Sequence, residues 1–413
     1  MGKAKGATSP NMALAMLFVV YTFNFLDRQV LSILAQPIKL DLGLSDSQVG
    51  ALGGLAFAML YSTMAIPLGL LADRTGRVRV VGISLAVWSG FTALCGLAGN
   101  FTQLFLYRLG VGVGEAGGVA PSYALIAGYF PPGRRARALA IYSAGAPLGI
   151  AIGVLFGSAI AAAVNWRVAF IALGLAGLLT AIPYFLLMRE PVETSTAEPV
   201  PARVVFRRLA VMPVFWLLAF GAAFSSLAGY GLSFWMPALA QRSYGLTLVQ
   251  TGQFVGLSVL ITGVTGVLTG GWLGDRFGNR DRSGYPLVGG WAFAICGPTF
   301  AIALFSPDPV WLFVSLLVPS SLAYMWMAPV ITTVQHLVSP RERATASACY
   351  LLINNSVGLG LGPLVVGKLS DMLAPTHGTE SLRLAMVAVA GSYVIAAVLM
   401  FLAAPRVRAA WQD

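Results

Sequence analysis

Long, uninterrupted apolar stretches run through this chain and restrict the folds that it can adopt. Of its 413 residues, 57% are hydrophobic and only 10% are charged, whereas soluble globular proteins carry roughly 25% charged residues. Within lipid, only helices and closed β-barrels satisfy every backbone hydrogen bond. Barrel strands are short and alternate polar with apolar residues. The continuous apolar runs therefore predict an all-α membrane protein.

Twelve of these stretches are long enough to cross a membrane, which takes about 20 apolar residues. They are residues 12–36, 46–72, 79–99, 101–130, 137–163, 167–188, 211–240, 247–273, 284–305, 309–336, 342–370 and 382–404. With the N-terminus inside, most of the 26 lysine and arginine residues fall in cytoplasmic loops, which follows the positive-inside rule. An even number of spans then places both termini in the cytoplasm. The net charge of +11 has this origin, so we expect no nucleic-acid partner.

An internal repeat divides the spans into two halves. Three pairs of segments match one another: 44–55 with 246–257, 69–79 with 271–281, and 132–142 with 340–350. The longest polar gap is rich in Pro, Glu and Thr and is expected to be a cytoplasmic linker. The predicted division is an N-terminal six-helix bundle over 1–188, a linker over 189–210 and a C-terminal six-helix bundle over 211–413. Parallel six-span repeats resemble the architecture of the major facilitator superfamily.

Two short basic loops, one in each half, resemble the signature loop of that superfamily. The candidate inner-gate residues are Gly69, Asp73, Arg74, Gly76 and Arg77 in the first copy and Gly271, Asp275, Arg276 and Gly278 in the second. We expect Asp73 to face the positive N-terminus of span 11 and Asp275 that of span 5, because helix N-termini attract carboxylates. The simpler alternative is that these residues are positive-inside charges on tight loops.

Spans 1 and 4 contain charged side chains, which are rare and usually functional at bilayer depth. Asp27 and Arg28 lie in span 1, and Arg108 and Glu115 lie in span 4. Asn24 shares a helix face with the first pair. We expect Asp27 and Glu115 to couple protons, while Arg28, Arg108 and Asn24 bind substrate and exchange charge partners with it. The alternative is a structural ion-pair cluster that holds spans 1 and 4 together.

The second half has no comparable charge set near the midplane and instead offers aromatic and amide side chains. The candidate cavity-lining residues are Tyr21 and Ser122 in the first half, and Tyr230, Trp235, Tyr324, Trp326, Asn354 and Asn355 in the second. A cavity that is charged on one side and aromatic on the other would suit an amphipathic ligand. The alternative is that these aromatic side chains only pack.

Residues 112–117 fit the pattern G-x-G-x-x-G but lie inside an apolar segment, without the strand that a dinucleotide site needs. We expect these glycines to allow close helix packing instead. The chain has two histidines and three widely separated cysteines, and these form neither a nucleophile–histidine–acid set nor a metal-ligand pattern. We therefore expect no enzyme activity, no metal and no cofactor, with protons as the coupling ion.

Two sequence motifs indicate a particular family within the major facilitator superfamily. Residues 24–28, NFLDR, and the block from Arg108 through 112–116 resemble spans 1 and 4 of the spinster family. That family includes exporters of sphingosine 1-phosphate and lysosomal lysophospholipid transporters. The resemblance implies proton-coupled movement of a lipid-like or other amphipathic anion, and we expect a rocker-switch mechanism. The short loops and compact size resemble a bacterial member of the family, so we expect a monomer surrounded by membrane lipids in a bacterial inner membrane. Hexuronate-type facilitators share both motifs, so a small organic anion is an alternative substrate. A lipid sensor without transport is a second alternative.

Overall fold

The computed structural model describes residues 8–191, 202–339 and 342–412, and within these ranges the chain is helical, without a strand. The α-helices are α1 (Pro10–Ile33), α2 (Ala35–Leu42), α3 (Asp46–Gly53), α4 (Leu55–Thr75), α5 (Arg77–Cys95), α6 (Phe101–Ala116), α7 (Val119–Tyr129), α8 (Pro132–Ser143), α9 (Gly145–Ala163), α10 (Trp166–Leu187), α11 (Ala202–Ala210), α12 (Pro213–Tyr244), α13 (Leu248–Gly278), α14 (Gly284–Leu304), α15 (Pro309–Leu322), α16 (Met327–Gln335), α17 (Arg343–Asn354), α18 (Gly360–His377), α19 (Ser381–Ala390) and α20 (Ser392–Ala410). A π-helical turn, η1 (Asn355–Leu359), joins α17 to α18, and a 3₁₀ turn, η2 (Gly378–Glu380), follows α18. The all-α prediction is confirmed.

In the described part of the chain, ten helical segments are long and apolar enough to cross a membrane. The difference from twelve has two sources. The predicted span 101–130 is divided into α6 and α7 at Gly117 and Gly118, so neither piece is long enough alone. The last segment, Thr345–Ala410, is counted once although it contains both final predicted spans, because the short turns η1 and η2 join its helices α17 to α20.

The helices form two compact units that exchange two short segments. Unit 1 comprises Met1–Leu44, Leu55–Thr196 and Thr247–Gly256, and unit 2 comprises Ser45–Gly54, Ala197–Leu246 and Leu257–Asp413. The main boundary falls inside the predicted linker, whose last part forms α11. The exchanged segments are the two members of the first matched pair of the internal repeat. These packing units are not the predicted continuous bundles, which stay a prediction, because the two segments are exchanged and the linker is divided between the units.

In unit 1, glycines bring the charge-bearing helices into backbone contact with their neighbours. A Cβ atom on Gly112 of α6 would lie 2.5 Å from the carbonyl oxygen of Phe57 on α4, and one on Gly114 would lie 2.6 Å from the backbone nitrogen of Trp88 on α5. On α9, a Cβ atom at Gly153 would lie 2.7 Å from the Leu26 carbonyl of α1. These positions confirm that the glycines of residues 112–117 serve helix packing. They fix the depth and rotation of α1 and α6.

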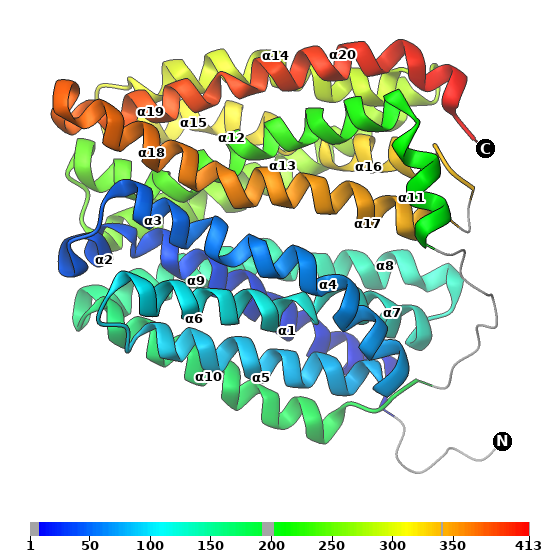
Figure 1. The fold of residues 1–413 in the computed structure, drawn as a ribbon, viewed down its shortest axis with the longest axis horizontal. Helices are drawn as coiled ribbons and strands as arrows, with labels where there is room; N and C mark the ends of the chain where they lie inside the picture. The colour runs from blue at the N-terminus through cyan, green and yellow to red at the C-terminus, as the bar shows by residue number, and fades with distance from the viewer. Residues whose placement is uncertain (1–7, 192–201, 340–341, 413) are drawn as a thin grey trace. The chain divides into compact units, whose positions relative to one another are not determined.

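In unit 2, helix α3 packs along α18, and Figure 1 shows the blue α3 beside the orange α18. A buried ion pair fixes its start. Both terminal nitrogens of Arg242, at the end of α12, bind the carboxylate of Asp46 at 2.7 and 2.8 Å. The Ser370 hydroxyl of α18 donates to the same carboxylate at 2.7 Å. Asp371 accepts hydrogen bonds from the backbone N–H groups of Asp46 and Ser47, so its charge caps the N-terminus of α3.

Replacing Arg242 by alanine is expected to lower the thermal stability of the purified protein. The Asp46 side chain is only 4% exposed, and removing one partner of a buried ion pair costs about 3–5 kcal/mol because the other charge remains buried. Thermal unfolding in detergent measures the effect. Arg167→Ala is the matched control, since its pair with Asp41 is 35% and 44% exposed, and exposed pairs contribute at most about 1 kcal/mol. Equal losses of stability in the two variants would contradict the argument.

Candidate functional site

The buried charges of unit 1 form two groups on different faces of α1, because neighbouring residues of a helix point about 100° apart. The first group contains Asn24, Arg28 and Glu115. Arg28 Nε donates a hydrogen bond to Glu115 Oε2 at 2.6 Å, and the Asn24 amide donates to the same oxygen at 3.0 Å. The Glu115 side chain is fully buried, whereas that of Arg28 is 13% exposed. The structure thus joins three predicted site residues of α1 and α6.

Three aromatic rings surround the Arg28 guanidinium. The ring centroids of Phe25, Phe57 and Tyr61 lie 5.0, 4.7 and 4.6 Å from its central carbon. A planar guanidinium stacks favourably on aromatic faces, and such contacts strengthen where water is excluded. Arg28 is therefore a positive centre surrounded by aromatic rings, and its side chain is not completely covered.

The second group contains Asp27, which is fully buried. Neither of its carboxylate oxygens has a hydrogen-bond partner among the described residues. The side chains of Trp88 and Thr92 from α5 lie near it, and so do Arg108 and Glu115. The Trp88 indole N–H and the Thr92 hydroxyl are donors beside the Asp27 carboxylate, although their geometry falls short of full hydrogen bonds. A carboxylate that is buried with only such weak contacts is costly to keep charged.

Arg108 lies between the two groups rather than in an ion pair. Its side chain is 2% exposed, and its Nε and Nη1 atoms have no hydrogen-bond partner in the described chain. Its guanidinium carbon lies 5.5 Å from the Phe57 ring centroid, and Phe57 also contacts Arg28. Phe57 itself is buried. One aromatic ring therefore touches both arginines of the predicted charge set.

The other two predicted residues of unit 1 belong to a tyrosine-rich cluster. Tyr21 stacks on Tyr142 with a centroid distance of 4.2 Å, and Tyr123 meets Tyr142 edge-on at 5.5 Å. Ser122 is fully buried and its hydroxyl donates to the Gly118 carbonyl at 2.7 Å. Sequence reasoning identified Tyr21 and Ser122 and missed the two partner tyrosines, because they lie on α7 and α8 without a motif of their own.

The predicted residues of unit 2 fall into two classes. Trp235 and Asn354 are buried and hydrogen-bonded: the Trp235 indole donates to the Pro363 carbonyl at 2.8 Å, and Asn354 accepts from Ser226 at 2.8 Å. Trp326 is buried too, beside Phe293. Tyr230 is 37% exposed, Tyr324 is half-buried, and Asn355 begins the π-helical turn η1. A cavity that these residues would share with unit 1 stays a prediction.

In the first gate loop, Gly76 joins α4 to α5 with a φ of 105°, a conformation that favours glycine. Asp73 forms an ion pair with Arg77 at 2.9 Å, while Arg74 is exposed and Gly69 has open space around its Cα. Glu190, which sequence reasoning missed, accepts a hydrogen bond from the Val78 backbone at 2.6 Å and so caps α5.

In the second gate loop, Asp275 is exposed and Arg276 lies over the Trp272 ring, with Gly271 in open space. Gly278 leaves room for the ring of Tyr285. Just after this loop, the carboxylate of Asp281 forms an ion pair with Arg408 near the end of α20. Hydrogen bonds from Arg408 and Ser283 hold the pKa of Asp281 below its usual range. The expected contacts of Asp73 and Asp275 with the opposite half stay predictions.

The comparison with known families identifies the chain. A family model described as Major Facilitator Superfamily matches residues 17–363. The chain belongs to this superfamily. It is 34% identical over 400 residues to an MFS-type efflux pump of Mycolicibacterium smegmatis, covering 96% of this chain and 93% of that pump. The predicted assignment as an integral membrane transporter rather than an enzyme is thereby confirmed.

Two further relatives narrow the comparison within the superfamily. A crystal structure of a bacterial homologue of the human lysosomal transporter Spinster, in an inward-facing and unoccupied conformation, aligns over 100% of both chains with a TM-score of 0.87 and 29% identity. A probable L-galactonate transporter of Escherichia coli is 31% identical over 278 residues, which cover 64% of this chain and 61% of that transporter. The predicted resemblance to bacterial spinster homologues is confirmed.

Proposed function

We propose that this facilitator is a proton-coupled secondary transporter of an amphipathic anion, of the lysophospholipid or sphingolipid type, that works by rocker-switch alternating access. The observation that carries the proposal is the buried Glu115 carboxylate held by Arg28 and Asn24. A carboxylate at membrane depth is stable when charged only while its cation stays in place. Any event that removes Arg28 from Glu115 therefore favours protonation of Glu115.

The anionic head of a substrate would supply that event. Arg28 is the partly exposed member of its pair, and a guanidinium binds phosphate or carboxylate through two parallel hydrogen bonds. When the head group takes over Arg28, Glu115 loses its counter-charge and takes up a proton. When the head group leaves, Arg28 returns to Glu115 and the proton is released. Binding of the anion and of the proton are coupled through one arginine.

Asp27 is the second proposed proton carrier. Its carboxylate is fully buried without a hydrogen-bond partner in the described chain, so protonation removes the cost of burying its charge. Arg108 is close enough to act electrostatically on Asp27 and on Glu115. We propose that Arg108 balances the summed charge of the two acids as protons enter and leave.

The aromatic rings around Arg28 support an amphipathic substrate, because they place apolar surface beside the positive centre. The second candidate is a small sugar acid, favoured by the relative described as a probable L-galactonate transporter. Competition experiments distinguish these candidates. A lysophospholipid should inhibit uptake if the substrate is an amphipathic anion, and a hexuronate should inhibit uptake if the substrate is a sugar acid. Saturable lipid binding without flux would instead indicate a sensor.

We further propose that the protein is a monomer in the bacterial inner membrane with both termini in the cytoplasm. The concentration of arginines in the loops on one side of the predicted spans supports the cytoplasmic position of the termini. Single cysteines introduced near position 280 and near position 378, tested with a membrane-impermeant thiol reagent on intact cells, distinguish the two sides. The first position should be protected and the second labelled.

The decisive experiment is an uptake screen in liposomes with and without an imposed pH gradient. Purified protein is reconstituted, and labelled lysophospholipid and labelled hexuronate are offered in parallel. The proposal expects lysophospholipid accumulation that rises with the gradient and collapses when an ionophore dissipates it. Equal accumulation with and without the pH gradient would show that transport is not coupled to protons.

Replacing Asp27 by asparagine is expected to reduce gradient-driven uptake to the level of protein-free liposomes without loss of thermal stability. Asparagine has the same shape but cannot carry a proton, and its amide oxygen can still face the nearby Trp88 and Thr92 donors. Asp41→Asn is the matched control, because Asp41 is 44% exposed in an ion pair with Arg167. Full gradient-driven uptake by the Asp27 variant would exclude Asp27 as a proton carrier.

A further inference from the structure

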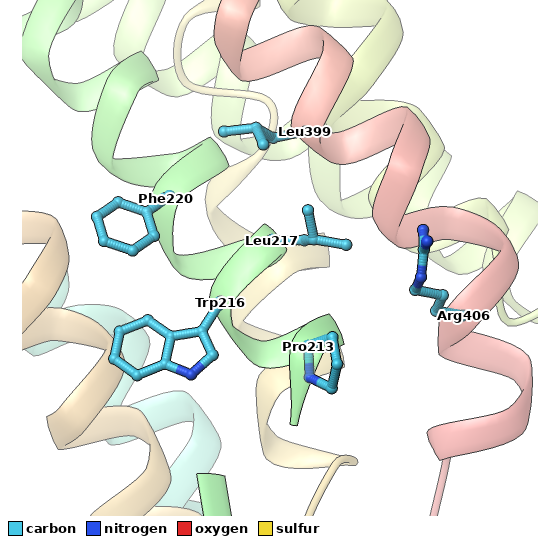
Figure 2. Close-up of a pocket in the computed structure, with 6 residues that line it drawn as sticks. All are labelled: Pro213, Trp216, Leu217, Phe220, Leu399 and Arg406. Carbon is cyan, nitrogen blue, oxygen red and sulfur yellow. The ribbon is translucent and has the colours of Figure 1, made fainter. Parts of the chain in front are cut away.

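An apolar groove lies on the surface of unit 2 between α12 and α20. Its volume is about 340 Å³, and it is lined by Pro213, Trp216, Leu217, Phe220, Leu399 and Arg406. Figure 2 shows Arg406 facing Leu217 and Pro213 across the groove, with Leu399 farther along α20. Five of the six lining side chains are apolar, and the sixth is a cation.

The groove has a polar end and an apolar end. Arg406 is near the end of α20 and Pro213 begins α12, so the cation lies at the helix ends that are predicted to face the cytoplasm. Leu217, Phe220 and Leu399 continue toward the middle of both helices. The Trp216 indole donates to the Ala210 carbonyl at 2.9 Å, and its ring stacks on Phe220 at 5.8 Å. Tryptophan with a bonded indole N–H is typical of the membrane interface.

The charge of Arg406 has no carboxylate partner among the described residues. Its exposed guanidinium makes one hydrogen bond, to the Leu402 carbonyl of its own helix. The other basic residue near this end of α20, Arg408, is already paired with Asp281. A guanidinium has five donors, so Arg406 retains the capacity to bind two oxygens of one anion.

We propose that this groove binds one anionic phospholipid of the surrounding membrane, with its phosphate on Arg406 and an acyl chain along Leu217, Phe220 and Leu399. Charge complementarity selects the occupant: an apolar wall that ends in an unpaired arginine at the cytoplasmic interface matches an anionic head group joined to a hydrocarbon chain. The groove shares no lining residue with the Arg28–Glu115 group or with the candidate cavity residues of unit 2, and we assign it to a resident lipid rather than to the transported substrate.

Native mass spectrometry of the purified protein tests the proposal. Phosphatidylglycerol and phosphatidylcholine with identical acyl chains are added in equal amounts, and bound lipid is counted as the detergent is increased. Wild-type protein is expected to retain one phosphatidylglycerol after phosphatidylcholine has been removed. Arg406→Gln should lower the affinity for phosphatidylglycerol by about tenfold to a hundredfold, which corresponds to the loss of charge-assisted hydrogen bonds. Arg406→Lys should lower this affinity by a smaller factor, because lysine keeps the positive charge.

Two control variants make the result specific to the groove. Arg137→Gln removes an exposed arginine of α8 that has no ion pair in the described chain, and it should retain the lipid as the wild type does. Arg28→Lys should also retain it. Equal retention by Arg406→Gln and wild type would overturn the proposal. So would loss of the lipid in Arg28→Lys with retention in Arg406→Gln, because the lipid would then occupy the transport site. Lipid retention is measured without transport, so a failure of this proposal is distinguishable from a failure of the proposed transport function.

Discussion

Glu115→Gln is expected to reduce pH-gradient-driven uptake to the level of protein-free liposomes while the protein stays folded. Glutamine keeps the size of the side chain, and its carbonyl oxygen can still accept from Arg28 Nε and from the Asn24 amide. It cannot take up a proton, so the step that couples anion binding to proton movement is lost. Downhill exchange of labelled for unlabelled substrate should persist, because exchange needs no net proton transfer.

Glu380→Gln is the control for this variant. Glu380 undergoes the same chemical change, but it is 46% exposed in an ion pair with Arg383 three residues away, and exposed pairs contribute little. Gradient-driven uptake by this control should match the wild type. If Glu115→Gln accumulated substrate against its gradient as well as the control does, Glu115 would have only a structural role.

The second large effect is expected for Arg28→Lys. A lysine keeps the positive charge next to Glu115 but has no planar fork to stack on Phe57 and Tyr61 while binding an anion through two hydrogen bonds. We expect substrate affinity to fall by about tenfold to a hundredfold, which corresponds to the loss of charge-assisted hydrogen bonds. The concentration dependence of initial uptake in liposomes measures this change.

The matched control is Arg167→Lys, which makes the same replacement in a pair that is largely exposed. Its half-saturating substrate concentration should equal that of the wild type. An unchanged half-saturating concentration in Arg28→Lys would mean that substrate does not bind this guanidinium. In that case, the aromatic rings around Arg28 would serve only to bury a structural ion pair.

The residue types and their spacing in the sequence predicted much of unit 1. The 100° angle between helical neighbours separated Asp27 from Arg28, and the structure places them on different sides of α1. The spacing also put Arg108 and Glu115 on nearly one face of α6. It could not show that Glu115 pairs with Arg28 across helices, or that Phe57 lies between the two arginines, because both facts depend on how α1, α4 and α6 pack.

Other features were missed for identifiable physical reasons. The division of span 101–130 had a local signal, because Gly117 and Gly118 are adjacent and glycine destabilises a helix interior. The pair Asp46–Arg242 had none, since the two residues are far apart in the chain and the repeated segment that contains Asp46 does not indicate its partner. Trp88 and Thr92 are ordinary span residues by composition, and only the fold places them near Asp27.

The exchange of residues 45–54 and 247–256 between the two units has a consequence for how each unit is completed. These segments occupy equivalent positions in the internal repeat, so the exchange is reciprocal. Each unit contains one segment whose sequence belongs to the other half of the chain. Neither half of the chain therefore encodes a whole unit, and folding of each unit requires residues from both halves.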